Sequence, residues 1–303
     1  MNQNELLLFN KFSLDLKESK RNYLYMLNEF KAHVNKNLLD VTPEDISSYI
    51  NSLNNNSGTK RRKYYELLSF YNFLFDELLI KTNPVSTISP PNSDNQIKLD
   101  RTLLLVNVKL FLNTLFEHFS LRDFVITLII ATTGLRVSEV LNIKWSDFII
   151  DDNSHIGVNV GNENNIRYVR IFDFVWKMIN KYRIDLEIPD YYLKEKYIVF
   201  FPENQLNLYR TNPQLVKPIT ALWLRKVYAK ACNIADIPYI TAKDIRHNYT
   251  MLCMNLGSPE EEIKEQLGWS STDFIYRYHG VVELLDSPIN KKVEEYYTEL
   301  LEV

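Results

Sequence analysis

The amino-acid sequence predicts a mainly α-helical protein of two domains, with one small antiparallel β-sheet in the second domain. Three observations lead to this fold class. Apolar residues recur at helical spacings over residues 4–88, a proline-rich polar segment follows at residues 89–97, and three short runs between residues 148 and 172 alternate like strands. We therefore expect an all-helical domain at residues 1–90 and an α-rich domain with the sheet at residues 97–303.

The first domain contains two signs of helix starts. In Thr42-Pro43-Glu44-Asp45 the threonine suits the N-cap, the proline suits the first helical position, and two acids follow in the first turn. A second helix is predicted at Lys60–Leu79, directly after Ser57-Gly58-Thr59. This helix opens with the densest basic run of the chain, Lys60-Arg61-Arg62-Lys63, where backbone amides and cations together favour phosphate. A solvated charged face is the alternative interpretation of the run.

The second domain is predicted to begin with helices and to continue with a three-stranded meander. Polar turns at Asp151–Ser154 and Gly161–Asn165 separate the strand-like runs, a pattern typical of hairpins. The rest of the domain is mainly helical, and its tail, Pro288–Val303, has apolar residues at helical spacing. The predicted helices are Leu103–Phe119 and Leu121–Thr133, and the predicted strands are Phe148–Ile150, Ile156–Val160 and Ile166–Phe172.

Composition and charge narrow the class of protein. The formal net charge is −3 and the sequence pI is about 6.0, which alone counts against nucleic-acid binding. One basic face can nevertheless bind DNA while acidic residues lie elsewhere. No glycine-rich nucleotide-binding loop is present in the sequence. Two isolated cysteines, Cys232 and Cys253, indicate a reducing compartment.

Targeting and metal-binding signals are not found in the sequence. The N-terminus lacks a basic region followed by an apolar core. The longest apolar run, Phe124–Ala131, contains Thr127 and is far shorter than the about 20 residues that span a bilayer. The five histidines form no ligand pattern. We expect a soluble cytoplasmic protein with no membrane contact, no cofactor and no metal site.

Three segments carry the strongest signal of function in the sequence. They are Ala131-Thr-Thr-Gly-Leu-Arg-Val-Ser-Glu-Val-Leu-Asn-Ile-Lys-Trp-Ser-Asp, then Lys243-Asp-Ile-Arg-His-Asn-Tyr, and finally Gln266-Leu-Gly-Trp-Ser-Ser followed by Tyr276-Arg-Tyr-His-Gly. In order and spacing they resemble the TGLRxSEhxxLxWxD, HxLRH and LGHSS boxes of the tyrosine recombinases, also called the phage-integrase family. The resemblance extends over nearly the whole chain, and it places Tyr278, nine residues after Trp269, at the nucleophile position.

The resemblance implies a site-specific DNA recombinase that cleaves and rejoins DNA through a 3′-phosphotyrosine at Tyr278, without metal or ATP. It implies that Arg136 and Arg246 bind the reacting phosphate, and a guanidinium fork does match phosphate geometry bidentately. Trp269 lies where the family has His or Trp and can donate a hydrogen bond through its indole N–H. Lys243 replaces the usual histidine of the second box, and it can supply charge or a proton.

Several of these roles have an alternative. Tyr276 is the rival nucleophile. Arg136 lies between apolar residues of a predicted helix, where a structural ion pair with Glu139 is the alternative to phosphate binding; Glu139 itself is expected to orient the arginine. His247 is either a support of the site or an ordinary core histidine.

The resemblance also implies domain roles and partners. Residues 1–90 resemble the family's helical core-binding (SAM-like) domain, which implies DNA contact by Lys60-Arg61-Arg62-Lys63, and residues 97–303 resemble its catalytic domain. The implied partner is a double-stranded DNA recombination site. On this DNA the chain is expected to assemble into a dimer or tetramer through the C-terminal helix at Pro288–Val303; packing of that helix on its own domain is the alternative.

One departure from the family pattern bears on activity. Alignment with the family's GKGxKxR hairpin places Asn162 where a lysine is expected, and no lysine occurs between Lys144 and Lys177. Asparagine cannot act as a general acid, and losing such a group commonly costs about 10²–10⁴ in rate. A catalytically lapsed DNA-binding accessory protein is therefore the second function considered, and a type IB topoisomerase is the third. For an active enzyme, the outcome is integration, excision or resolution of a mobile element or replicon.

Overall fold

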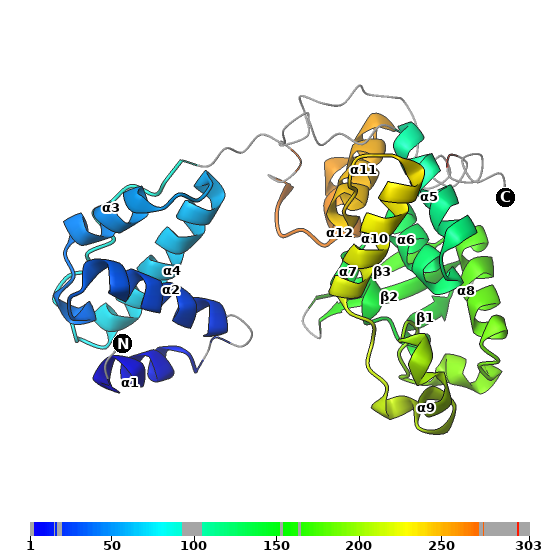
Figure 1. The fold of residues 1–303 in the computed structure, drawn as a ribbon, viewed down its shortest axis with the longest axis horizontal. Coiled ribbons are helices and arrows are strands. Elements are labelled where there is room, and N and C mark those ends of the chain that lie inside the picture. Colours follow the sequence, from blue (N-terminus) through cyan, green and yellow to red (C-terminus); the bar gives the residue numbers. More distant parts are fainter. Residues whose placement is uncertain are drawn as a thin grey trace. The chain divides into compact units, whose positions relative to one another are not determined.

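The structure, a computed structural model, describes residues 3–14, 16, 20–92, 105–151, 154–162, 165–272, 275 and 296, and Figure 1 shows the chain as a ribbon. The chain divides into two compact units, Met1–Asn95 and Gln96–Val303. Regular structure among the described residues of the first unit is helical, whereas the second unit combines helices with a three-stranded sheet. The predicted fold class, mainly α with a small antiparallel sheet, is confirmed.

Aromatic contacts join the helices of the first unit. Phe12 packs against Phe70 and Phe73 with ring centroids 5.4 Å apart, and Phe30 packs against Tyr49 at 5.0 Å. These rings lie in one buried cluster, in edge-on and tilted arrangements that aromatic quadrupoles favour. The helices of this unit are α1 (Gln3–Phe12), α2 (Lys20–Val34), α3 (Pro43–Ser52) and α4 (Ser57–Asp76).

The two predicted helix starts in this unit have different outcomes. Thr42 caps α3 as predicted, because its hydroxyl accepts a hydrogen bond from the Asp45 amide while the Asp45 carboxylate accepts one from the Thr42 amide at 3.0 Å. The second prediction was wrong by one turn: α4 begins at Ser57, since Oδ1 of Asn56 accepts from the Thr59 amide at 2.9 Å and caps the helix there. The basic run therefore lies inside α4 rather than at its first turn.

Helix α6 is the centre of the second unit. Every residue from Arg122 to Thr133 is buried, and α6 contacts α5, α7, α8 and α11. A helix enclosed on all sides by its neighbours is expected to be apolar all round, as this one largely is. The helices of the unit are α5 (Leu105–His118), α6 (Leu121–Thr133), α7 (Val137–Leu141), α8 (Asp173–Asp185), α9 (Leu206–Thr211), α10 (Ala221–Ala235), α11 (Ala242–Asn255) and α12 (Glu260–Leu267).

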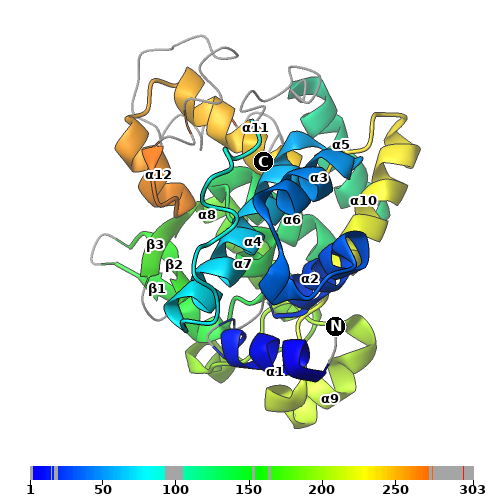
Figure 2. The same cartoon turned by 90° about the vertical axis from the view of Figure 1, so that its left-hand side faces the viewer.

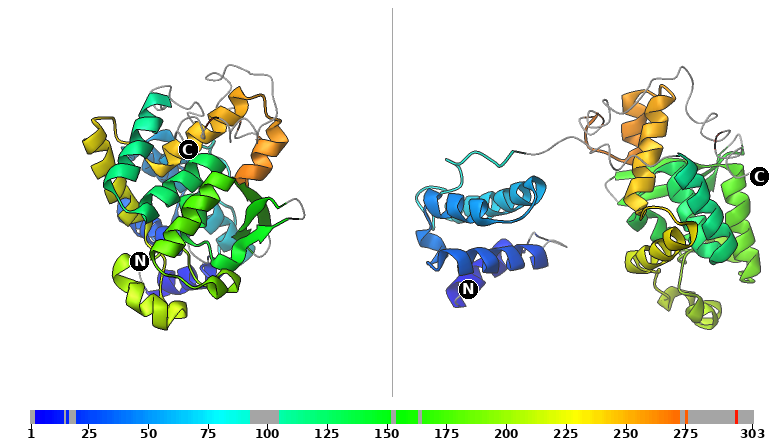
Figure 3. Two further views of the ribbon diagram at one scale, coloured as in Figure 1. Left: turned by 90° about the vertical axis from the view of Figure 1, so that its right-hand side faces the viewer. Right: turned by 45° about the horizontal axis from the view of Figure 1, so that its top comes forward.

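The sheet is an antiparallel meander with β2 in the centre. Its register places Val158 opposite both Phe148 and Val169, and both valines are fully buried in the core of the unit. Figures 2 and 3 show α12 lying next to β3, and the two elements are in contact. The observed strands agree with the predicted ones to within two residues. They are β1 (Phe148–Ile150), β2 (Ile156–Asn162) and β3 (Asn165–Ile171).

Parts of the C-terminal predictions lie outside the described residues. These include Tyr276, Tyr278 and the tail helix expected at Pro288–Val303, of which the structure describes Tyr296 alone. Tyr296 is helical and packs against the hydrophobic core of its own unit. Across the described part of the chain, not one helix has both the length and the apolar character that a membrane span requires.

Candidate active site

The end of α6 brings the first two candidate segments together. Gly134 ends the helix with a φ of +65°, which few residues other than glycine adopt readily. It also lies tightly against α11 and α12, because a Cβ at this position would be 2.4 Å from Cδ1 of Tyr249 on α11 and 2.6 Å from Cδ2 of Leu267 on α12. The chain therefore turns at Gly134, two residues before Arg136.

Arg246 is held by two backbone oxygens. It lies on α11, whose start is fixed by reciprocal hydrogen bonds between Thr241 and Asp244. Its Nη1 donates to the Gly134 oxygen at 2.6 Å and its Nη2 donates to the Leu267 oxygen at 2.8 Å. The side chain is 12% exposed, so the guanidinium is held in place with a small part of its surface open.

Arg136 also binds the backbone at the end of α12. It lies just before α7 with an extended backbone rather than within a helix, which corrects the prediction. Its Nη2 donates to the Gly268 oxygen at 3.1 Å, and its Nη1 pairs with Oε1 of Glu139 at 3.0 Å. The structural pair with Glu139 therefore exists. It leaves the Arg136 side chain 44% exposed, so the same guanidinium is still open to a ligand.

Glu139 is the anionic centre of the cluster. Its Oε2 accepts from the Arg136 amide at 2.7 Å and lies 3.9 Å from Nη1 of Arg246. Burial opposes ionisation of this carboxyl, but the hydrogen bonds from Arg167 and from the Arg136 amide outweigh burial and hold its pKa below the ordinary value. Glu139 is thus an ionised carboxylate that orients the arginines around it.

Arg167 is the residue of the cluster to which the sequence interpretation gave no role. It lies on β3, and its Nη1 and Nη2 donate to the two carboxylate oxygens of Glu139, each at 2.9 Å. Its Nε donates to the Gln266 oxygen at 3.0 Å. The available signal was the arginine that ends the family's hairpin pattern, which aligns with Arg167.

Three arginines therefore meet three consecutive backbone oxygens at the C-terminal end of α12. Arg167 binds the Gln266 oxygen, Arg246 binds the Leu267 oxygen and Arg136 binds the Gly268 oxygen. The negative end of a helix dipole favours cations at this position. With three guanidiniums and one carboxylate, the cluster carries a net charge of +2, which suits it to bind a phosphodiester and to stabilise charge that develops on it.

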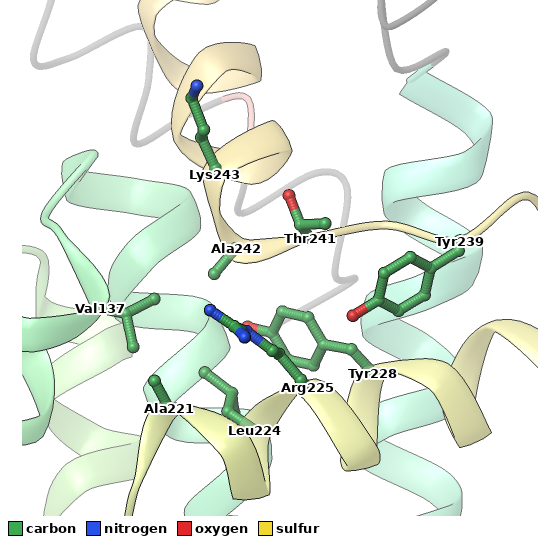
Figure 4. Close-up of a pocket in the computed structure, with 9 residues that line it drawn as sticks. All are labelled: Val137, Ala221, Leu224, Arg225, Tyr228, Tyr239, Thr241, Ala242 and Lys243. Carbon is green, nitrogen blue, oxygen red and sulfur yellow. The ribbon is translucent and has the colours of Figure 1, made fainter. Parts of the chain in front are cut away.

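Lys243 and Trp269 lie beside this cluster. Lys243 is exposed in the first turn of α11, one helical turn before Arg246, so the two residues share a helix face. It borders a pocket of about 420 Å³ that Val137, at the start of α7, also lines. Figure 4 shows Arg225 of α10 lying across this pocket, while the Lys243 side chain extends from its rim. Trp269 directly follows Gly268 and is half-buried.

The sequence analysis also singled out His247 and Asn162. His247 is half-buried on α11, next to Arg246. Asn162 ends β2, opposite Asn165 in the register of the hairpin. Within the described part of the chain, no group of three or more His, Cys, Asp or Glu side chains is arranged to hold a metal ion.

The basic run of the first unit does not form one continuous surface. Lys63 is buried, with its side chain 7% exposed and its Nζ 2.6 Å from Oε1 of Glu29. Arg62 is 54% exposed and pairs with Glu66 at 2.8 Å. Arg61 and Lys60 are partly exposed. The structure thus brings Lys60, Arg61 and Arg62 to the surface and gives Lys63 a buried ion pair.

Comparison with known proteins gives a consistent set of similarities. Residues 103–283 match the model of the phage integrase family. The chain is 27% identical over 298 residues to tyrosine recombinase XerC of Listeria innocua, covering 89% of this chain and 92% of the relative. It is 28% identical over 274 residues to tyrosine recombinase XerD of Rickettsia prowazekii, covering 84% of each chain.

Two solved structures have a similar fold. One is XerH site-specific recombinase bound to palindromic difH substrate, a post-cleavage complex, with a TM-score of 0.67 and 17% identity over 92% of this chain and 79% of that chain. The other is a lambda integrase tetramer bound to a Holliday junction, with a TM-score of 0.62 and 14% identity over 88% of this chain and 77% of that chain.

Proposed function

The chain belongs to the phage integrase family of tyrosine recombinases, and on this basis we propose that it is an active site-specific recombinase that cleaves DNA through Tyr278. The observation that carries the proposal is that the guanidiniums of Arg136 and Arg246 meet at the end of α12. Both guanidiniums are fixed by backbone oxygens of residues 134 and 267–268, while Arg136 stays 44% exposed. Donors held in advance of the reaction stabilise a transition state without reorganisation.

The proposed chemistry is a transfer of a phosphodiester to the tyrosine. Oη of Tyr278 attacks the scissile phosphorus as its hydroxyl proton passes to solvent. A P–O bond to Tyr278 forms, and the bond to the 5′-oxygen breaks. Arg136 and Arg246 bind the non-bridging oxygens, and Trp269 donates a further hydrogen bond from its indole. Lys243 donates the proton that the leaving 5′-oxygen takes up. The bond energy is kept in the phosphotyrosine ester, so attack by a 5′-hydroxyl reverses the step.

We further propose that the ligand is a double-stranded recombination site and that the chain assembles on it. The XerH structure is bound to its difH substrate, and the lambda integrase structure is a tetramer on a Holliday junction. In this proposal residues 1–90 act as a core-binding domain and residues 97–303 as a catalytic domain. Lys60, Arg61 and Arg62 contact DNA phosphates. The outcome of recombination is integration, excision or resolution of a mobile element or replicon.

The tail at residues 288–303, for which the sequence predicts a helix, is proposed to link protomers. Tyr296 packs against the core of its own unit, and exchange of the helix would place Tyr296 in the same hydrophobic site of a neighbour, because exchanged elements keep their contacts. Deletion of residues 288–303 should then leave single-site binding intact and remove cooperative binding to a two-site DNA. Unchanged cooperativity would contradict the exchange.

A catalytically lapsed DNA-binding protein is the second candidate, and Asn162 is the observation in its favour. A suicide substrate, nicked near the scissile phosphate so that cleavage releases a short strand, separates the candidates. In EDTA and without ATP, a recombinase should yield a covalent protein–DNA adduct that survives SDS. Site binding without an adduct would support the accessory role. Relaxation of supercoiled DNA that lacks the site would support a topoisomerase.

A further inference from the structure

We propose that Arg167 is a positioning residue for phosphate binding, which acts by neutralising Glu139 and by holding the segment after α12 in place. This inference rests on the proposed function and assigns a residue that the chemistry above does not use. Arg167 comes from β3, a different element from those that carry Arg136 and Arg246. Its side chain is 13% exposed, so its guanidinium is mostly enclosed by the groups that it binds.

All three nitrogens of the Arg167 guanidinium are engaged. Nη1 and Nη2 form two parallel bonds to Glu139 at 2.9 Å, and Nε binds the Gln266 oxygen at 3.0 Å. A paired fork of this kind fixes the carboxylate in both position and orientation. One side chain therefore joins β3, α7 and the end of α12.

The ion pair between Arg167 and Glu139 determines how much positive charge of Arg136 and Arg246 remains available to a phosphate. The Glu139 side chain is 12% exposed, and its Oε1 is 3.0 Å from Nη1 of Arg136. A buried carboxylate that loses its main partner retains a large desolvation cost. Without Arg167, Glu139 would draw Arg136 and Arg246 toward itself, because they are the other cations within 4 Å among the described residues. These are the two guanidiniums proposed to bind the phosphate.

The segment after α12 is shaped around Arg167. Gly268 has a φ of +60°, and a Cβ at this position would lie 2.7 Å from Nη1 and 2.8 Å from Cζ of Arg167. The guanidinium is therefore packed directly against the glycine. Because the Gly268 oxygen accepts from Arg136 and Trp269 follows next in the chain, a shift of Arg167 would be transmitted to both.

The first test measures cleavage and binding separately. Arg167→Ala should lower single-turnover adduct formation by about 10²-fold, the scale expected for a misplacement of about 1 Å, with site affinity changed less than about threefold. Arg167→Lys keeps the charge but loses the fork, so its rate should be intermediate. Arg170→Ala is the matched control: it removes the same charge three residues along β3, from the opposite face of the strand, and should cleave at nearly the wild-type rate.

A double variant distinguishes charge control from simple structural support. If Arg167 neutralises Glu139, then Glu139→Gln added to Arg167→Ala should raise the rate of the single variant by at least about tenfold, because Arg136 and Arg246 are released. A further fall in rate, or no change, would overturn the charge role. Near-wild-type cleavage by Arg167→Ala alone would overturn the whole inference.

A second measurement does not depend on cleavage. Hydrogen exchange of the backbone amides in residues 260–272 of the full chain should be faster in Arg167→Ala than in wild type and in Arg170→Ala. Unchanged exchange would overturn the positioning role even if wild type formed no adduct. Failure of the proposed function, seen as no wild-type adduct, is therefore distinguishable from failure of this inference.

Discussion

Arg246 and Leu267, 21 residues apart in the sequence, are joined by a hydrogen bond of 2.8 Å from the guanidinium Nη2 to the backbone oxygen. The arginine of the second box is thus held by a backbone oxygen of the third box. Gly134 of the first box supplies the other acceptor, at 2.6 Å. The three boxes are consequently parts of one hydrogen-bonded site, which explains in physical terms why they occur together.

Lysine should not replace either phosphate-binding arginine. Arg136→Lys and Arg246→Lys keep a positive charge but lack the planar fork that binds a backbone oxygen and a phosphate together. We expect each variant to form adduct about 10²–10³-fold more slowly, the usual cost of removing one donor to a transition-state oxygen. Filter binding should show site affinity within about threefold of wild type. Arg210→Lys, an exposed residue of α9 paired with Glu187, is the control, and a lysine variant as fast as this control would refute the assignment.

Gly268→Ala should impair cleavage without contacting DNA itself. The added methyl would meet the Arg167 guanidinium. The alanine backbone would also have to keep a left-handed conformation, which costs about 1–2 kcal/mol. We expect slower adduct formation together with a modest fall in the midpoint of thermal unfolding. Gly58→Ala, where a Cβ meets nothing closer than 3.8 Å, is the control. Equal cleavage rates in the two variants would show that the contact between Gly268 and Arg167 is not needed.

Most of the framework could be predicted from local sequence. The bounds of α6 matched the prediction because Ser120 caps its start and Gly134 ends it, and both signals lie within a few residues of the helix. The strands were found because polar turns separate them. The boxes placed Arg136 and Arg246 in the same site, where the structure also has them.

The remaining features depend on contacts between distant parts of the chain. Arg167 binds residues that are 28 positions earlier and 99 positions later. No local sequence pattern predicts contacts between residues so far apart in the chain. Lys63 looked like its exposed neighbours, yet its partner Glu29 is 34 residues away. The start of α4 was placed too late because Asn56 caps the helix, so that Ser57, Gly58 and Thr59 belong to its first turn.

The basic run should separate into DNA-contacting and structural residues. Replacing Lys60, Arg61 and Arg62 with glutamine should flatten the log–log salt dependence of DNA binding by about 0.9 for each phosphate that these side chains neutralise in the wild type. Lys63→Gln should instead lower the free energy of unfolding by about 1–3 kcal/mol, because Glu29 is left without its partner. Salt titrations and chemical unfolding of both variants test this. A triple variant with the wild-type salt slope would remove the run from the interface.

Lys243 is predicted to donate the proton to the leaving group. A 5′-alkoxide, whose conjugate acid is as weak an acid as water, leaves poorly without a proton. We expect Lys243→Ala to cleave normal DNA at least about 10²-fold more slowly and to recover most of the rate on DNA with a 5′-bridging sulfur, whose thiolate leaves unprotonated. Lys226→Ala, on the exposed face of α10, is the control. An equal fall in rate on both substrates would mean that Lys243 supplies charge or structure instead.

The covalent attachment site tests the central claim most directly. Wild-type protein is trapped on the nicked suicide substrate, the adduct is digested, and the DNA-linked peptide is sequenced by mass spectrometry, with Tyr278→Phe and Tyr276→Phe in parallel. We predict a 3′-phosphate ester on Tyr278, no adduct from Tyr278→Phe despite normal site binding, and a normal adduct from Tyr276→Phe. An adduct that persists in Tyr278→Phe and disappears in Tyr276→Phe would contradict the assignment of the nucleophile.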